Sequence, residues 1–159
     1  MRRGRLLGMI LLASACQPAT TRPYFPPVTG AAQAEVRLEP RNATAALADV
    51  LRSDSLPVTR VVVRDGYLET DWFLVGSRQV ARGRRLGLGV VQIRAWVDPT
   101  RKGYSRLTVE TVYRPVADAS LSPRELDHQV PPDHPVGKRV TEIVTELAKL
   151  YAPETAPVP

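Results

Sequence analysis

The sequence predicts an α+β fold: a two-layer domain in which one antiparallel sheet of about five strands carries two helices on one face. Three observations support this. Strand-like alternation recurs between residues 58 and 114, an Asp-Gly turn joins two of these runs, and amphipathic helical patterns lie near both ends. The expected element order is β-α-β-β-β-β-α. Because the alternating runs are apolar on one face only, both helices are expected to pack there.

The predicted domain begins with a short strand followed by a helix. Residues 35–39 alternate, with Val36 and Leu38 on one face. Asn42 is a good helix N-cap. Apolar residues then recur at helical spacing as far as Ser53, namely Ala43, Leu47, Val50 and Leu51.

A hairpin is expected next. The β-branched run 58–64 leads into Asp65-Gly66, a strong signal for a tight turn. The partner strand spans residues 67–75. One of its faces carries Leu68, Thr70, Trp72 and Leu74, and the other carries Tyr67, Glu69, Asp71 and Phe73.

Two longer strands, residues 86–98 and 104–114, are expected to form an antiparallel pair. In the first, four residues point inward (Val91, Ile93, Ala95 and Val97) and three point outward (Gln92, Arg94 and Trp96). In the second, Leu107, Val109, Thr111 and Tyr113 oppose Arg106, Thr108, Glu110 and Arg114.

A Pro-rich excursion over residues 115–135 precedes the last helix. Within it, Ser122 is expected to cap one helical turn over residues 122–126. A helix over residues 136–151 follows. Its apolar stripe comprises Val136, Val140, Ile143, Val144, Leu147 and Leu150.

Residues 1–15 are typical of an export signal. Arg2, Arg3 and Arg5 precede an apolar run over residues 6–12, which is too short to cross a bilayer, and small residues lead to Cys16. The ending LASAC resembles the signal of bacterial lipoprotein precursors. That resemblance implies diacylglyceryl and acyl groups on Cys16 as the link to the membrane. Gln17 then favours the outer membrane, with the domain facing the periplasm, over the inner membrane. The alternative is an ordinary secretory signal cut after residue 15, which would leave Cys16 as a free thiol on a secreted protein.

The segments that flank the domain are Pro-rich. Residues 16–34 lack a periodic pattern and predict a semi-extended tether. Tyr24 and Phe25 are interpreted as incidental aromatics in it, the alternative being that they dock on the domain or on a partner. Residues 35–151 form the single domain, and residues 152–159 a disordered tail.

Charge and cysteine usage narrow the function. The formal charge of +6 falls to +3 without Arg2, Arg3 and Arg5. Together with export, this argues against a nucleic-acid partner. Cys16 is the sole cysteine, so no intramolecular disulfide stabilises the fold.

Candidate catalytic groups are few. His128 and His134 each follow an aspartate, which makes a metal pair or an acid/base site one interpretation. Their spacing matches no zinc signature. We therefore interpret them as polar loop residues, with Asp133 or His134 capping the last helix. No catalytic residue, metal or cofactor is expected, and a metal-dependent enzyme is the less favoured alternative.

The outward sheet face and one loop are the candidate binding surfaces. Several charged residues are expected to form solvated cross-strand ion pairs, namely Glu69, Asp71, Glu110, Arg94 and Arg106. Trp96 shares this face, either as a contact surface or covered by the long loop. The mobile basic loop 77–85 holds four arginines that would suit anionic headgroups or an acidic partner: Arg78, Arg82, Arg84 and Arg85.

The element order and the segment Glu69-Thr70-Asp71-Trp72 resemble the helix-grip domains of the lipoprotein C subunit of the β-barrel assembly machinery. This resemblance implies a helix-grip-like fold and a non-catalytic binding or assembly-accessory role with an envelope protein partner. Helix-grip folds also allow a small ligand or lipid in the groove between the sheet and the long helix.

Overall fold

A computed structural model of the chain describes residues 20–83 and 85–152. The predicted signal 1–15, Cys16, Arg84 and nearly all of the predicted tail 152–159 lie outside the described residues. Within the described ranges, no helix has the length and apolar character needed to cross a membrane.

One antiparallel sheet forms the centre of the domain. Its main path runs through β1 (Ala32–Val36), β6 (Tyr104–Tyr113), β5 (Val90–Arg101), β3 (Tyr67–Thr70) and β2 (Val58–Val62). Two further short strands extend it: β4 (Phe73–Leu74) pairs with β5, and β7 (His128–Gln129) pairs with β6. The predicted α+β class is confirmed.

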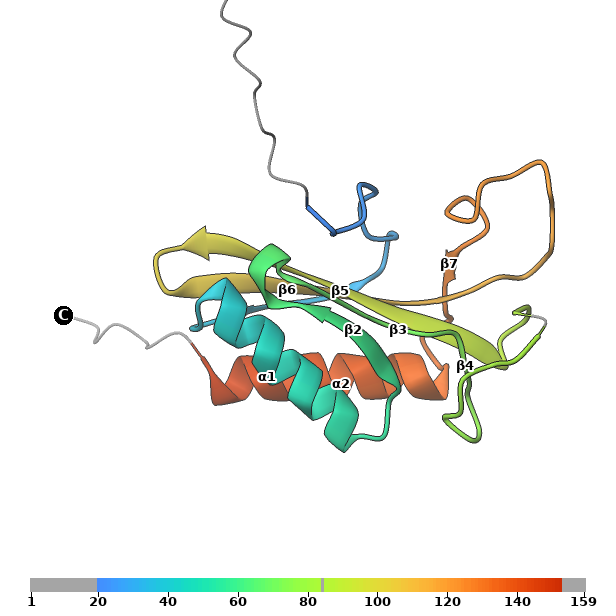
Figure 1. The fold of residues 1–159 in the computed structure, drawn as a ribbon. Helices are drawn as coiled ribbons and strands as arrows, with labels where there is room; N and C mark the ends of the chain where they lie inside the picture. The colour runs from blue at the N-terminus through green and yellow to red at the C-terminus, as the bar shows by residue number, and fades with distance from the viewer. Residues whose placement is uncertain (1–19, 84, 153–159) are drawn as a thin grey trace, which may run out of the picture.

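Both helices, α1 (Pro40–Ser53) and α2 (Pro135–Leu150), lie on the same face of the sheet (Figure 1). The core between the layers joins Leu47 and Leu51 of α1, Ile143 and Leu147 of α2, and the inward row of β5. That row is the predicted one, Val91, Ile93, Ala95 and Val97, and all of it is buried. We refer to the opposite side of the sheet as the outer face.

Several details of the elements differ from the sequence prediction. β1 lies over Ala32–Val36 rather than 35–39, because its pairing with β6 ends where Val36 meets Ser105. α1 begins at Pro40, with Glu39 rather than Asn42 as N-cap. A proline fits the first turn because its missing N–H would have no partner within the helix there. Leu150, predicted in the buried stripe, is exposed at the last residue of α2.

The Asp-Gly hairpin is present between β2 and β3, after a 3₁₀ turn (η1, Val63–Asp65). Gly66 has φ +62°, and a Cβ there would lie 2.2 Å from the carbonyl oxygen of Val97, so this position requires glycine. The strand predicted over 67–75 breaks after Thr70, whose hydroxyl accepts the N–H of Ile93. Because the strand is interrupted there, the faces that continuous alternation predicted for residues 72–74 are not observed.

Candidate functional site

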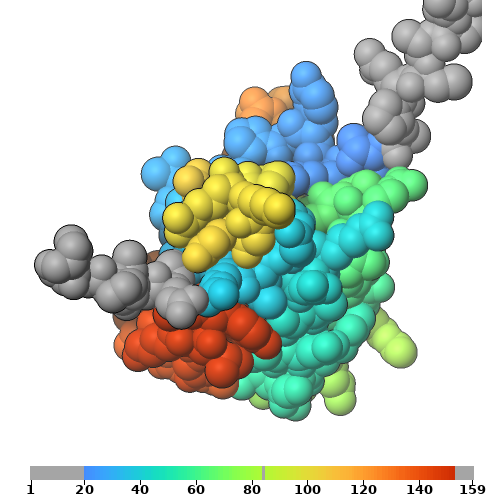
Figure 2. Space-filling model, turned by 90° about the vertical axis from the view of Figure 1, so that its left-hand side faces the viewer, coloured from blue at the N-terminus to red at the C-terminus, as the bar shows by residue number. Residues whose placement is uncertain are grey.

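Residues 20–28, which we call the strap, lie across the outer face of the sheet, on the side opposite the helices (Figures 1 and 2). The extended tether predicted for residues 16–34 therefore differs from the structure over these residues. After the strap, a turn in which Ala31 N–H donates to Val28 leads into β1.

Polar contacts fix the beginning of the strap. Arg22 makes a two-pronged bond to Asp98, with N···O distances of 2.7 and 3.2 Å. Thr21 donates its backbone N–H and its hydroxyl to Asp65 at 2.8 and 2.9 Å. The pKa of the Asp65 carboxyl is lowered to about 2, mainly by the hydrogen bond from the Thr21 N–H and next by the hydrogen bond from the Arg64 side chain. Arg60 donates to the Thr21 carbonyl at 2.5 Å.

The end of the strap is held through its backbone. The N–H of Val28 donates to Glu110 Oε2 at 2.7 Å, and Arg124 donates to the carbonyl of Pro26. These two contacts satisfy one donor and one acceptor of an extended chain. Side chains of the domain thus supply the partners that a neighbouring strand would otherwise offer to this backbone.

Phe25 lies at the centre of the strap. Its ring has the guanidinium of Arg124 at 4.5 Å and that of Arg94 at 5.1 Å from its centroid. It also meets Trp96 edge to face, with centroids 6.2 Å apart. Each such contact adds about 0.5–1 kcal/mol to the apolar burial of the ring. Phe25 therefore docks on the domain, which was one of the alternatives to an incidental aromatic in the tether.

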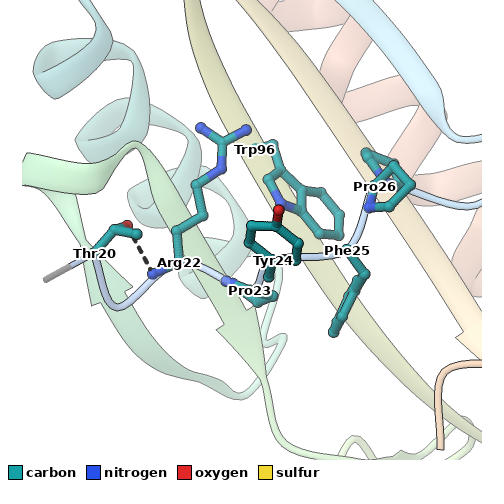
Figure 3. Close-up of a pocket in the computed structure, with 8 residues that line it drawn as sticks. Thr20, Arg22, Pro23, Tyr24, Phe25, Pro26 and Trp96 are labelled. Atoms are coloured by element: carbon teal, nitrogen blue, oxygen red, sulfur yellow. Dashed lines mark hydrogen bonds between the residues drawn. The ribbon is translucent and has the colours of Figure 1, made fainter. Parts of the chain in front are cut away.

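Trp96 lies on the outer face as predicted but is buried, with 2% of its surface exposed. It packs between Phe25 of the strap and Tyr67 of β3, whose ring centroid is 5.6 Å away. The strap crosses over it (Figure 3), and the two line a hollow of about 420 Å³. The strap, not the long loop 115–135, covers the indole. The pKa of the Tyr67 phenol is raised, mainly because the group is buried and also because it donates a hydrogen bond to Glu69.

Five charged side chains form a group beside the strap, which we call the ion cluster: Arg94, Glu110 and Asp127, which are buried, and Arg114 and Arg124, which are partly buried. Glu110 pairs with Arg94 at 2.6 Å and with Arg124 at 3.0 Å. Asp127 pairs with Arg94 at 2.5 Å and with Arg114 at 2.7 Å. Glu110 has no exposed surface and Arg94 only 6%.

The prediction of solvated ion pairs on this face is therefore wrong for Arg94 and Glu110. Their cross-strand pairing is as expected, because they lie opposite each other in β5 and β6. The strap and the loop that carries Arg124 and Asp127 exclude water from them. Buried charges are stable only when each is matched in geometry, and here every carboxylate meets two guanidiniums.

The four-residue segment that carried the family resemblance is divided between environments. Glu69 lies on the outer face and accepts from the Tyr67 hydroxyl at 2.6 Å. Thr70 binds the backbone of β5. Trp72 is buried in a small cluster with Val90 and Val112, under the guanidinium of Arg114 at 4.7 Å.

The two histidines are not brought into one site. His134 is the N-cap of α2 and accepts the N–H of Gly137, while its Nε2 lies 3.0 Å from the Leu88 carbonyl oxygen. The capping interpretation is confirmed for His134. His128 is exposed on β7. Among residues 20–83 and 85–152, no group of three or more His, Cys, Asp or Glu side chains is arranged to hold a metal ion.

The basic loop lies at one end of the sheet. Arg82 and Arg85 are exposed, whereas Arg78 is partly buried with φ +60°. A hollow of about 410 Å³ separates this loop from the long loop, with Arg85 and Leu126 among its lining residues.

Sequence reasoning missed Arg22, Arg124 and Asp127 as partners in this site. All three lie in segments without a periodic pattern, so nothing in their spacing placed them near the outer face. The usable signal was Phe25, an aromatic residue within a Pro-rich run, together with Trp96 on a charged strand face.

The chain matches no protein-family model and no curated protein sequence. The role of the strap and the ion cluster is therefore inferred from their geometry and chemistry.

Proposed function

We propose that this protein is a lipid-anchored envelope protein, attached through acyl groups on Cys16 to the outer membrane and facing the periplasm. In this proposal its domain is a helix-grip-like, non-catalytic module for binding or assembly. Two helices packed on one face of an antiparallel sheet support the comparison with helix-grip domains.

The observation that carries the proposal is the position of the strap. It begins at Thr20, four residues after Cys16, and is fixed to the outer face at both ends. With a lipid on Cys16, these contacts couple the orientation of the whole domain to the anchor.

The chemistry of the outer face also supports a binding role over a catalytic one. The carboxylates of the ion cluster are engaged by arginines and by the strap backbone, rather than directed into an open cleft. Of the candidate binding residues, Arg94 and Trp96 are covered and cannot contact a partner directly, so the exposed basic loop remains as the candidate partner surface. Arg82 and Arg85 suit an acidic envelope protein.

The anchor is tested by expressing the full chain in a Gram-negative bacterium and measuring the intact mass of the membrane-extracted protein. We expect the mass of a mature chain that starts at Cys16 and carries acyl groups. Cys16→Ser should yield a non-acylated protein that is absent from the membrane fraction. An unmodified cysteine on a secreted protein would overturn the proposal.

The partner is tested by cross-linking in the envelope. The comparison is between the parent chain and the double variant Arg82→Gln/Arg85→Gln, with Arg52→Gln on α1 as a matched surface control. A specific cross-link lost only in the double variant supports the basic loop as partner site. An undiminished cross-link excludes the loop.

Small-ligand binding is a second candidate because of the hollow beside Arg85. Leu86 and Leu126 contribute apolar lining and Arg114 a guanidinium, a combination that suits an anionic amphiphile. Native mass spectrometry of the detergent-extracted protein tests it. A co-purified lipid lost in Leu126→Asp would support it, and a bare chain would exclude it.

A further inference from the structure

The outer face exposes several apolar side chains. Tyr24 of the strap is fully exposed, beside the partly buried Phe25 (Figure 3). Val116 and Leu121, 55% and 41% exposed, belong to the loop between β6 and β7, which projects on the same side of the sheet as the strap (Figure 1). Only one charged residue, Asp118, lies between Pro115 and Ser122.

The chain length between the proposed anchor and the strap limits where the bilayer can be. Residues 16 and 20 are four Cα steps apart, a span of at most about 14 Å when fully extended. Thr21 is already held by Asp65 on the outer face. The helix layer, itself about 10–12 Å thick, lies on the other side of the sheet. A link this short places the outer face, not the helices, beside the membrane.

We propose that the outer face rests on the lipid bilayer, with Tyr24 and Leu121 inserted at the headgroup level as two contact points. This inference depends on the proposed lipid anchor. The acyl groups supply the affinity, so the two side chains need only set the orientation. Tyr suits the interface because its ring is apolar and its hydroxyl stays hydrated.

The contact is expected to be apolar rather than electrostatic. Next to Tyr24, Arg22 is paired with Asp98, and Arg60 with Glu69. These charges compensate each other, so the strap end presents little net charge to phosphate headgroups. Insertion should therefore occur equally on neutral and on anionic bilayers, and should withstand salt that screens surface charges.

Single introduced cysteines carrying a nitroxide label measure this arrangement. In the acylated protein Cys16 is blocked, so each new cysteine is labelled alone. The sites are Tyr24→Cys, Leu121→Cys and, as control, Leu150→Cys. Leu150 is also an exposed leucine, 72% accessible, but it lies on α2 in the helix layer. All three side chains are exposed, so the fold tolerates the change.

Labelled, acylated protein is reconstituted in phosphatidylcholine vesicles, and label accessibility to oxygen and to a water-soluble nickel complex is compared. We expect the oxygen-to-nickel ratio to be several-fold higher at positions 24 and 121 than at 150. Adding phosphatidylglycerol should not change it. Equal ratios at the three positions, or a high ratio only with phosphatidylglycerol, would overturn the inference.

Intact mass of the same sample separates the two proposals. Acylated protein with equal label accessibility overturns the orientation alone and leaves the anchor intact. Protein without acyl groups overturns both.

Discussion

Glu110 is the residue on which the strap, the sheet and the ion cluster meet. Its carboxylate lies within hydrogen-bond or ion-pair distance of Arg94, Arg124 and the N–H of Val28, and has no exposed surface. Glu110→Gln keeps the shape and one acceptor but removes the charge. Arg94 then retains only Asp127 as a buried counter-charge.

The size of the effect follows from burial. Removing one partner of a buried ion pair costs about 3–5 kcal/mol, because the other charge is left uncompensated. The Gln carbonyl still accepts a hydrogen bond and Asp127 still compensates Arg94, so the expected loss of unfolding free energy lies at the lower end of this range, about 3 kcal/mol. For a domain of this size that corresponds to a melting temperature lower by about 10 °C.

The assay is urea denaturation of the Cys16→Ser chain with and without Glu110→Gln. Glu35→Gln is the matched control, since it removes an equivalent carboxylate whose pair with Arg101 is solvated. The control should cost less than about 0.5 kcal/mol. Chymotryptic cleavage after Tyr24 should also accelerate in Glu110→Gln as the strap loosens. If both variants lose the same small free energy of unfolding, the buried cluster does not hold the strap and the reasoning is refuted.

Three further predictions concern single positions. Gly66→Ala should lower the free energy of unfolding by at least about 2 kcal/mol, because its Cβ would meet a backbone oxygen at 2.2 Å. Gly103→Ala, at φ +78° in open space, should cost only about 1 kcal/mol; equal losses would contradict the steric argument. The pKa of Asp65 is lowered from 3.8 to about 2, so its bond to Thr21 stabilises the strap above pH 3.8 and is lost as pH falls through 2. NMR titration of the Thr21 amide should show that low midpoint, and a midpoint near 4 would argue against the contact. His134→Ala should cost about 1 kcal/mol by removing a helix cap, and zinc should leave the melting temperature of both forms unchanged. A zinc-dependent rise lost in the variant would instead indicate a metal site.

Much of the sheet was predictable because its strands have one apolar face. Alternation placed Ile93 and Val97 in the core and Arg94 on the opposite side, and the structure agrees. The Asp-Gly turn was predictable for a local reason, since residue 66 must adopt a left-handed conformation. The break after Thr70 was not, because it depends on hydrogen bonds to β5, a strand some twenty residues away.

The candidate site was predictable only in part. Alternation indicated that Arg94, Trp96 and Glu110 share a face, but not that the face is covered. Burial of that face depends on residues 20–28 returning to it, and this segment has no periodic signal. Its fit depends on one ring between two guanidiniums and on backbone groups meeting Glu110 and Arg124.

The sequence by itself determined the α+β class, the face of the sheet that carries the helices and the prediction of a lipidated Cys16. The first two depend on composition and period, which local residues express without help from distant ones, and the third is what the resemblance of LASAC to lipoprotein signals implies. Tertiary structure alone decided that the Pro-rich segment is a strap, that Trp96 is buried and that five charges share one cluster with three of them buried. The physical reason is that long-range contacts set the solvent exposure of a side chain, and exposure decides whether a charged face is a surface or an interior.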